Sequence, residues 1–585
     1  MSGIFLKLTV LVAGVLVSIG MYADSIMISV AEKQKSYASI IERSRTLIEK
    51  EMSKDKDIAG LSIVLVDNEG AIWSEGFGWA SKIDQRALTS DTAMMVGSVS
   101  KVFTAIAVMQ LVEQGKIDLD RAFVDYVPEF LIQRHNAEWP AVTIRHMLTH
   151  RSGVPDEHHQ GLFDDPFDSE KMSYMALPEA LSGEFLISRP GHLFAYANIP
   201  FSLLSVLVEK LSGEVFPEYV QNHILTPLGM GHSSFLPDVR VSSRLAKGFR
   251  DSKTELDYPY FRDIGAGSLA ATADDMGKFM IALLNDGAEI LQPQSLQEMF
   301  RQQNAGSPLD GPIKVGLSFF INDLDGKINA RRNISHAGGL EGHQALMVSL
   351  PDDDLAIAVM TNSNAGMKLI YQLADDVLAA AYHVKTGETL PEIEKPKTIS
   401  LSQKQLGAYV GYYVTPYDAD VLWRIYTKKG KFLVRAGSTT LELVPHEGGV
   451  FSLQYKLFGF IPLDLEELRD VWLHGAIVGD LPHFWLNTLG VFLSPVDPVP
   501  VLQSWKDLVG EYKVDNLNDE SVLKESGAVI KWDKKSGFLL INGRPVRTIN
   551  DRYAVYMGNA RGFGGTIERL SGDRLYYSGL IYSRK

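Results

Sequence analysis

A nearly continuous apolar run from Val102 to Val112, ended by Glu113-Gln114-Gly115, constrains the fold of this chain more than any other stretch. The run predicts a helix without a polar face, and such a helix must be buried on most sides. Gly115 is placed to cap its C-terminus. We therefore expect a domain assembled around a core helix that begins near residue 100.

Ser98 and Lys101 stand at the start of this predicted helix. Residues three apart share a helix face, and the unpaired N–H groups at a helix N-terminus favour developing negative charge. A buried lysine can lose its proton and accept one from a neighbouring hydroxyl. Ser98 and Lys101 are therefore candidates for a nucleophile and its base. The alternative is a helix cap beside a lysine that reaches solvent.

The surroundings of this motif distinguish it from chance matches. Ser-x-x-Lys occurs three times in the chain, at Ser53/Lys56, Ser98/Lys101 and Ser521/Lys524. The first and third matches lie beside charged residues, where a lysine is most simply a solvated surface group. Only Lys101 leads into an apolar helix that could strip water from its ammonium group.

Composition bounds the class of protein. A chain of 585 residues is too long to fold around a single hydrophobic core, so roughly two to four domains are expected. The formal charge of −14 argues against nucleic acid and anionic membrane surfaces as partners. The sequence has no cysteine, which excludes disulfides, thiol catalysis and cysteine metal sites.

The N-terminus has the pattern of a secretory signal. Lys7 precedes an apolar run from Leu8 to Gly20, and Ala23 or Gly20 offers a cleavage site. We predict a signal peptide over residues 1–23 and a periplasmic or secreted protein. The alternative is an uncleaved anchor, the one route by which we expect membrane contact, although the run is short for a bilayer span.

The order of elements indicates the architecture of the first domain. We expect a helix within 29–52, strands over 60–67 and 71–78, mostly helices from 105 to 300, strands near 315–321, 343–350 and 355–361, and a helix over 367–381. Strands at both ends with helices between them must share one sheet. This order predicts an α/β sheet that carries an inserted helical lobe.

Beyond residue 385 the chain becomes rich in strands and turns. Residues 386–400 form a linker stiffened by prolines. Tyr409-Val410-Gly411-Tyr412-Tyr413 is echoed 99 residues later by Leu508-Val509-Gly510-Glu511-Tyr512, and Lys431 to Val434 is loosely echoed by Gly537 to Leu540. We therefore divide the chain into a first domain at 24–385 and two related β-barrel-like units at 401–500 and 501–585.

Two further segments could complete a site around Ser98. Tyr196-Ala197-Asn198 is the only Tyr-x-Asn in the chain and stands where a loop enters a helix. A tyrosine held near a lysine ammonium can act as a base, because the cation favours phenolate. The glycines of His336-Ala337-Gly338-Gly339 let a strand edge approach a ligand and offer backbone N–H groups. Lys385-Thr386-Gly387 falls where the last helix meets the linker, and we interpret it as incidental.

In this order, Ser98-x-x-Lys101, Tyr196-x-Asn198 and His336-x-Gly338 resemble the motifs of the class C β-lactamase and penicillin-binding serine hydrolase family, with its D-aminopeptidase and DD-peptidase relatives. Met147 to Gly153 is similar to a helical-lobe segment of that family, and the resemblance covers roughly residues 35–385. It implies an α/β (α+β) fold in which helices flank an antiparallel-rich sheet. The C-terminal units resemble barrels appended to some D-aminopeptidases.

The resemblance also implies a role for each residue. Ser98 would attack a carbonyl and form an acyl-enzyme. Lys101 and Tyr196 would carry out the proton transfers, and which of them is the base is left open. Asn198 would orient the lysine and a substrate amide. The backbone N–H groups of Ser98 and Gly339, beside Gly338, would form the oxyanion hole, with His336 on the opposite wall of the cleft.

One departure from the family pattern bears on the substrate. Many β-lactamases of this type carry Lys-Thr-Gly where this chain has His336-Ala337-Gly338, so one hydroxyl is lost and the cation depends on pH. This favours a peptidase for D-amino acid bonds, or an esterase, over a β-lactamase.

The leading hypothesis is an exported serine hydrolase without a metal or other cofactor, acting on a small molecule or a short peptide. The main alternative is an inactive relative that binds cell-wall fragments. A third, less favoured reading is a metallohydrolase that uses His146, His150, His158 and His159. The sequence leaves the oligomeric state open.

Overall fold

The computed structural model describes residues 36–585 apart from short gaps at 166, 169–170, 237, 259, 325, 392–393, 395, 416–421, 458–460, 464–470, 487–491, 518–526 and 559–563. The predicted signal peptide lies outside the described residues. Within them, every helix is too short or too polar to span a bilayer.

A seven-stranded antiparallel sheet forms the centre of the first domain. Its strand order is β3 (Arg86–Ala87), β2 (Ala71–Ser81), β1 (Gly60–Asp67), β11 (Leu355–Thr361), β10 (His343–Leu350), β9 (Ile334–Leu340) and β8 (Phe320–Ile321). The strands at both ends of the domain share one sheet, as the sequence predicted, and β1 pairs directly with β11. The fold is therefore the α/β (α+β) arrangement expected, with an antiparallel sheet.

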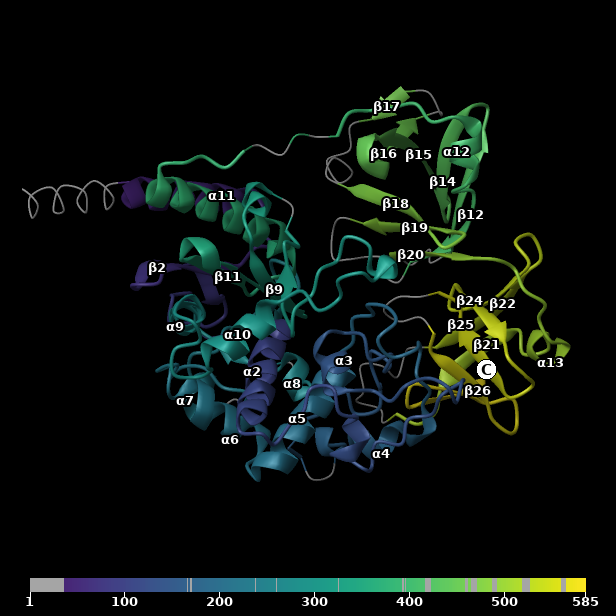
Figure 1. Ribbon diagram of the computed structural model, residues 1–585, viewed down its shortest axis with the longest axis horizontal. Helices are drawn as coiled ribbons and strands as arrows, with labels where there is room; N and C mark the ends of the chain where they lie inside the picture. The colour runs from purple at the N-terminus through teal and green to yellow at the C-terminus, as the bar shows by residue number, and fades with distance from the viewer. Residues whose placement is uncertain are drawn as a thin grey trace, which may run out of the picture.

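The two faces of the sheet pack against different helices (Figure 1). Val64 and Val66 of β1 join a core cluster shared with α9 (Ala273–Leu284) and the helical lobe. Leu65 joins a second cluster on the other face, with α11 (Met367–Thr386) and a helix over 36–54. This alternation along β1 follows from the two-residue period of a strand, and apolar side chains on both faces explain why helices cover both.

The helical lobe lies between β4 (Met94–Met95) and β8 in the sequence. It contains η1 (Gly97–Val99), α2 (Ser100–Glu113), η2 (Phe123–Asp125), α3 (Ile144–Leu148), η3 (Tyr174–Ala176), α4 (Leu177–Ala180), η4 (Leu181–Gly183), α5 (Ile199–Ser212), α6 (Phe216–Val220), η5 (Gln221–Leu225), α7 (Val239–Ser242), α8 (Ile264–Gly267), α10 (Pro293–Phe300) and η6 (Pro308–Asp310), with short strands β5 (Gly248–Phe249), β6 (Glu255–Leu256) and β7 (Ala270–Ala271). The turn η7 (Lys327–Ala330) lies between β8 and β9. α2 is the predicted core helix, and its residues from Ser100 to Met109 are buried.

Two predictions for this domain need correction. Ser98 lies in the 3-10 turn η1 rather than in the first turn of α2 itself. The strand expected over 315–321 is limited to Phe320–Ile321, because Gly316 N–H donates to Phe319 O and Ser318 has a φ of +68°, which closes a tight turn.

Two closed eight-stranded barrels follow the first domain. The first is formed by β12 (Gly411–Val414), β13 (Leu422–Lys428), β14 (Lys431–Ala436), β15 (Thr439–His446), β16 (Val450–Leu457), β18 (Trp472–Val478), β19 (Leu481–Leu486) and β20 (Phe492–Val496), with β17 (Ile461–Leu463) on the edge of β16. The second runs through β21 (Gly510–Val514), β22 (Ala528–Asp533), β23 (Phe538–Ile541), β24 (Arg544–Thr548), β25 (Tyr553–Tyr556), β26 (Thr566–Arg569), β27 (Leu575–Tyr577) and β28 (Leu580–Arg584).

The sequence echo marks equivalent positions in the two barrels. A short helix precedes the first strand of each, α12 (Gln403–Gly407) and α13 (Gln503–Lys506). Tyr413 donates its hydroxyl proton to Tyr409 O at 2.7 Å, and Tyr512 donates to Leu508 O at 2.8 Å. The same tyrosine bond, with the same four-residue spacing, therefore occurs at the first strand of both barrels.

The second barrel packs against the helical lobe (Figure 1). Tyr576 donates to Glu184 Oε1 at 2.7 Å, and His135 Nε2 lies 2.8 Å from Thr566 Oγ1. The turn between β27 and β28 holds the lobe segment 156–159, since Ser578 Oγ donates to Glu157 O and His159 N–H donates to Ser578 O at 2.9 Å. We refer to residues 156–159 as the junction loop.

Candidate active site

The amine of Lys101 lies at the centre of a set of oxygen atoms. Lys101 Nζ is 3.0 Å from Ser98 Oγ, 2.8 Å from Asn198 Oδ1 and 2.8 Å from the carbonyl oxygen of Ala266. The lysine is fully buried. Three distant segments, η1–α2, the N-terminus of α5 and α8, therefore converge on one amine.

These contacts orient the amine toward the serine. Asn198 Oδ1 and Ala266 O can only accept hydrogen bonds, so each directs an N–H bond of the lysine to itself. A neutral amine held in this way has its lone pair left for Ser98 Oγ. The arrangement is that of a nucleophile beside a base, with the base in turn oriented by other groups.

Two glycines bring strand β9 against the serine turn. A Cβ atom on Gly338 would lie 1.9 Å from Val96 O and 2.7 Å from Ser98 N, and one on Gly97 would lie 2.5 Å from Gly339 N. No side chain fits at these distances, and Gly97 also has a φ of +51°. The backbone N–H groups of Ser98 and Gly339, predicted as the oxyanion hole, thus belong to two segments in direct contact.

Tyr196 is held by an aromatic platform. Its ring stacks on the ring of His150 with 4.1 Å between centroids, and Lys101 Nζ lies 4.9 Å from the centre of the tyrosine ring. His150 Nδ1 accepts from Ala197 N–H at 3.2 Å. His150 therefore fixes both the ring and the backbone of the Tyr-x-Asn segment.

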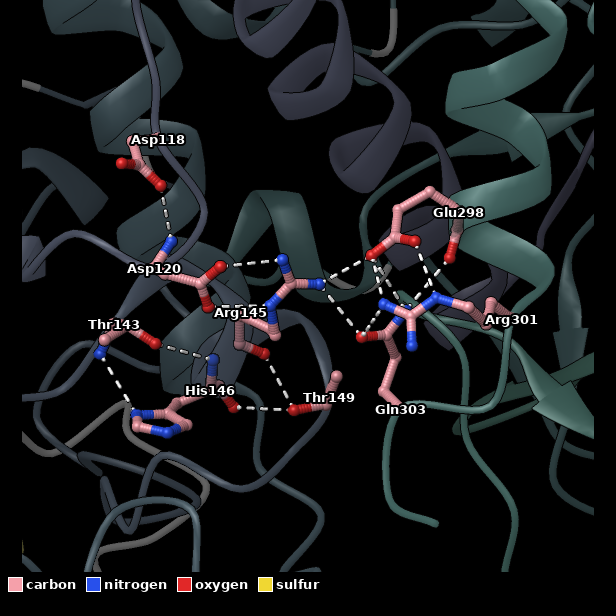
Figure 2. A network of polar contacts seen from close by, with 9 residues as sticks. All are labelled: Asp118, Asp120, Thr143, Arg145, His146, Thr149, Glu298, Arg301 and Gln303. Atoms are coloured by element: carbon pink, nitrogen blue, oxygen red, sulfur yellow. Dashed lines mark hydrogen bonds and ion pairs between the residues drawn. The ribbon is translucent and has the colours of Figure 1, made fainter.

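Figure 2 shows how α3, the helix that leads to His150, is anchored. The guanidinium of Arg145 bridges Asp120, at 2.7 Å, and Glu298 of α10, also at 2.7 Å. The flanking Arg145 and Arg301 guanidinium groups lower the pKa of the Glu298 carboxyl. Thr143 and His146 close a capping box at the N-terminus of α3.

His336 lies on the opposite wall as a neutral side chain. Burial, together with the positive charge of Lys101, lowers its pKa to about 3. Its Nδ1 contacts Ala337 O at 2.6 Å, which makes Nδ1 the donor, while Nε2 has no hydrogen-bond partner among the described residues. His336 therefore offers an acceptor and supplies no cation at neutral pH.

The convergent residues open into a cleft of about 850 Å³. Ser98, Tyr196, Asn198, His336, Gly338 and Gly339 all line it. Aromatic rings form much of the remaining wall, including Phe194, Tyr258 and Phe320. The structure thus gathers every residue that the sequence analysis assigned to the serine hydrolase site, and Lys101 lies buried beside them.

The charged side chains of the cleft are mostly acidic. Glu157, Asp257, Asp323 and Glu341 line it, whereas Arg250 is the one basic side chain among the described lining residues. Arg250 Nε is itself 2.6 Å from Glu341. A substrate in this cleft therefore meets a negative rim.

The histidines of the metallohydrolase hypothesis and the Lys385-Thr386-Gly387 motif have structural roles. His146 caps α3, His150 supports Tyr196, and His158 and His159 face the second barrel. Among the residues that the structure describes, no group of histidine and acidic side chains has the geometry of a metal site. Lys385-Thr386-Gly387 ends α11, with Lys385 Nζ bound to Asp354 O at 3.0 Å.

Sequence analysis missed Asp156 and the role of α8. Asp156 accepts hydrogen bonds from the backbone N–H groups of Asn198 and Ile199, which sets the start of α5. Nothing in the local sequence marks Asp156. α8 was signalled only by Gly265-Ala266-Gly267, where a Cβ on Gly265 would meet Phe201 O at 2.7 Å.

Comparison with known proteins identifies the family of this chain. The family model described as Beta-lactamase matches residues 46–381, which is more than half of the chain. Penicillin-binding protein 4* of Bacillus subtilis (strain 168) is 25% identical over 67% of this chain and 87% of its own length. Beta-lactamase-like protein 2 of Dictyostelium discoideum is 32% identical over 54% of this chain and 57% of its own length.

Solved structures share the fold at lower identity. The octameric penicillin-binding protein homologue from Pyrococcus abyssi has a TM-score of 0.52 and 22% identity, covering 77% of this chain and 99% of that one. SurE has a TM-score of 0.57 and 21% identity, and the match covers 79% of this chain and 100% of the SurE chain. The family match covers the whole Ser98, Tyr196 and His336 constellation. The chain belongs to the Beta-lactamase family and is a serine hydrolase of amide or ester bonds.

Proposed function

We propose that the protein is an exported hydrolase that forms an acyl-enzyme on Ser98. We propose that it cleaves amides or esters of D-amino acids in preference to β-lactams. The observation that carries this proposal is the 3.0 Å contact between Ser98 Oγ and a fully buried Lys101 amine whose other contacts include two obligate acceptors.

The reaction would proceed in two balanced steps. The Ser98 hydroxyl proton passes to Lys101 or Tyr196 as Oγ bonds to the substrate carbonyl carbon, and the carbonyl oxygen gains negative charge between the N–H groups of Ser98 and Gly339. The bond to the amine or alcohol then breaks, and that leaving group takes the proton. Water repeats the sequence on the acyl-enzyme and releases the acid. Each oxyanion donor contributes on the order of 10²–10³ in rate.

Charge in the cleft supports a substrate with a free amine. Four carboxylates line the rim against two cations, because Arg250 pairs with Glu341 and Lys247 pairs with Asp257, so the rim is negative overall. His336 is neutral above about pH 3, so the position that carries a cation in many β-lactamases holds none here. A β-lactam or a C-terminal peptide brings a carboxylate to this rim, whereas an N-terminal D-amino acid brings an ammonium group. The fold also serves SurE, which has been crystallised with D-Leu, so D-amino acid amides are the first class to test.

Active-site labelling tests the acyl-enzyme. We expect a fluorescent fluorophosphonate to label the purified protein, and labelling to disappear in Ser98→Ala. Ser521→Ala, which changes a serine of the same sequence pattern, is the matched control. If no acylating probe, including a fluorescent penicillin, labels the folded protein, the alternative of a non-catalytic binder of cell-wall fragments is the better account.

A substrate panel tests the chemical class. D-Leucine p-nitroanilide, its N-acetyl derivative, p-nitrophenyl acetate and nitrocefin should be compared on one preparation. We expect the free amine to give the highest kcat/KM among the amides. Preference for nitrocefin over both leucine anilides would contradict the proposed specificity while leaving the acyl-enzyme intact. Cell fractionation of a tagged full-length chain tests export.

A further inference from the structure

The second barrel contains a cavity of about 270 Å³ where it meets the helical lobe. Most of its described lining residues belong to the barrel, and one, His159, comes from the junction loop. The cavity is therefore separate from the active-site cleft, which is lined by Glu157 of the same loop. Neither the proposed reaction nor the packing of the barrel accounts for it.

The polar part of this cavity favours an anion. Arg544 is the only charged side chain among the described residues that line it, and its guanidinium lies 5.8 Å from the centre of the Tyr556 ring. Tyr577 and Tyr582 add two more phenols, and burial raises the pKa of all three, which keeps them as neutral donors. Burial lowers the pKa of His159 to about 4, so this histidine adds no charge.

The rest of the lining is apolar. Ile541, Ile567 and Leu575 contribute side chains that are at most 3% exposed. A site that presents the five N–H donors of a guanidinium group, several hydroxyl donors and an apolar wall matches a molecule with a negative head and a hydrocarbon body. The volume equals that of roughly nine water molecules, which limits the ligand to about ten non-hydrogen atoms.

The first barrel shows that the hollow is not inherent in this architecture. Its interior is filled by a chain of ring contacts, with Phe451 lying 5.7 Å from Phe432 and 5.6 Å from Phe484, and Phe484 lying 5.4 Å from Tyr413. The two barrels share strand number, the entry helix and the tyrosine bond. Among the described residues, an arginine and three phenols line the cavity of the second barrel.

We propose that this cavity is a binding site for a small organic carboxylate, with the carboxylate accepting hydrogen bonds from Arg544 and the tyrosine hydroxyls and the hydrocarbon body lying against Ile567 and Leu575. The site belongs to the barrel and does not depend on the catalytic proposal.

Calorimetric titration of the full chain with hexanoate and benzoate tests the site, with hexanamide and benzamide as neutral isosteres. We expect both acids to bind and both amides to bind at least tenfold more weakly. Arg544→Gln should weaken acid binding at least tenfold. The matched control is Arg552→Gln, which removes an exposed arginine paired with Glu568 in the same barrel and should leave binding within twofold.

A second variant keeps the test decisive if Arg544→Gln misfolds. Ile567→Phe fills the cavity without removing its charge and should also abolish binding of the acids. Acid binding that survives both variants in folded protein, or no binding to the unmodified chain at 10 mM ligand, overturns the proposal. Inorganic phosphate bound as tightly as hexanoate overturns the assignment of an amphipathic ligand.

Discussion

In the part of the chain that the structure describes, two hollows of opposite character lie on either side of the junction loop. The cleft of the first domain is large, lined by aromatic rings and rimmed by carboxylates, and it contains a serine in contact with a buried amine. The barrel cavity is about a third of its volume, carries one arginine among phenols, and has no serine or threonine among its described lining residues. We propose that the first cleaves bonds in cationic substrates and that the second holds an anion.

This difference shows how function is divided in the chain. Chemistry depends on close approach of backbones and on a buried base, which the sheet and core helix provide. Ligand retention needs only a lined volume, which a barrel provides once its interior is not filled by rings. The following predictions, from the largest expected effect to the smallest, separate the two hollows further.

Ser98→Ala should reduce kcat/KM by at least about 10³-fold, because the nucleophile is lost while binding and the oxyanion donors remain. The same variant should bind hexanoate as the unmodified chain does, within twofold. Steady-state kinetics and calorimetry on one preparation measure both. Loss of hexanoate binding in Ser98→Ala would place the anion in the cleft and merge the two sites.

Acid should destabilise the cleft wall through His336. Its pKa in the folded protein is about 3, below the ordinary value of about 6.5, so between these values the unfolded chain binds a proton that the folded chain does not. Its contribution to stability is complete above pH 6.5 and falls by about 1.4 kcal/mol per pH unit below it, or roughly 3 kcal/mol by pH 4.5.

Denaturant unfolding at a series of pH values measures this effect. His336→Gln should flatten the stability profile between pH 6.5 and 4.5 relative to the unmodified chain. His383→Gln, which changes an exposed histidine at the end of α11, serves as the control and should leave the profile unchanged. Equal slopes in all three proteins would show that His336 is not the buried neutral group described.

Glu157→Gln should raise KM for a D-amino acid amide by about three- to tenfold, because one partly buried negative charge on the rim is lost. The N-acetyl analogue, which has no ammonium group, should be unaffected. Asp257→Asn provides the comparison, since its side chain is 94% exposed and its carboxylate is already paired with Lys247 at 2.7 Å. An equal effect of Glu157→Gln on both substrates would argue against recognition of the amine.

Tyr576→Phe should lower the free energy of unfolding by about 1–3 kcal/mol, because the buried Glu184 carboxyl loses its 2.7 Å hydrogen-bond donor. Turnover should change little. Thermal unfolding measures the loss, with Tyr426→Phe on the first barrel as the control. No loss of stability would indicate that the barrel is held to the lobe by its other contacts.

The strands and the candidate site were readable from the sequence for a physical reason. β1, β10 and β11 are buried on both faces and appear as apolar runs with clear ends, so their predicted bounds match the structure. Ser98, Tyr196 and His336 carry motifs whose spacing along the chain is tied to chemistry. The Gly411-Tyr412-Tyr413 echo was visible because a tyrosine bond to the backbone needs a fixed spacing.

Other features depend on tertiary contacts and leave no local signal. The stacking of His150 on Tyr196 joins residues from separate segments. Asp156 accepts a hydrogen bond from the backbone N–H of Asn198, which lies far along the chain. Likewise, Arg544 and Arg547 look alike in the sequence of β24, and only closure of the barrel turns Arg544 toward the cavity. The barrel cavity and the charged side chain that lines it could therefore be identified only from the structure.

The junction loop links the two hollows in a way that thermodynamics makes symmetric. Glu157 lies in one and His159 in the other, while Asp156 holds the backbone of Asn198. If an occupant of the barrel changes the affinity of the cleft by some factor, a substrate in the cleft changes the affinity of the barrel by the same factor. The four residues 156–159 are the segment through which such a reciprocal effect would pass.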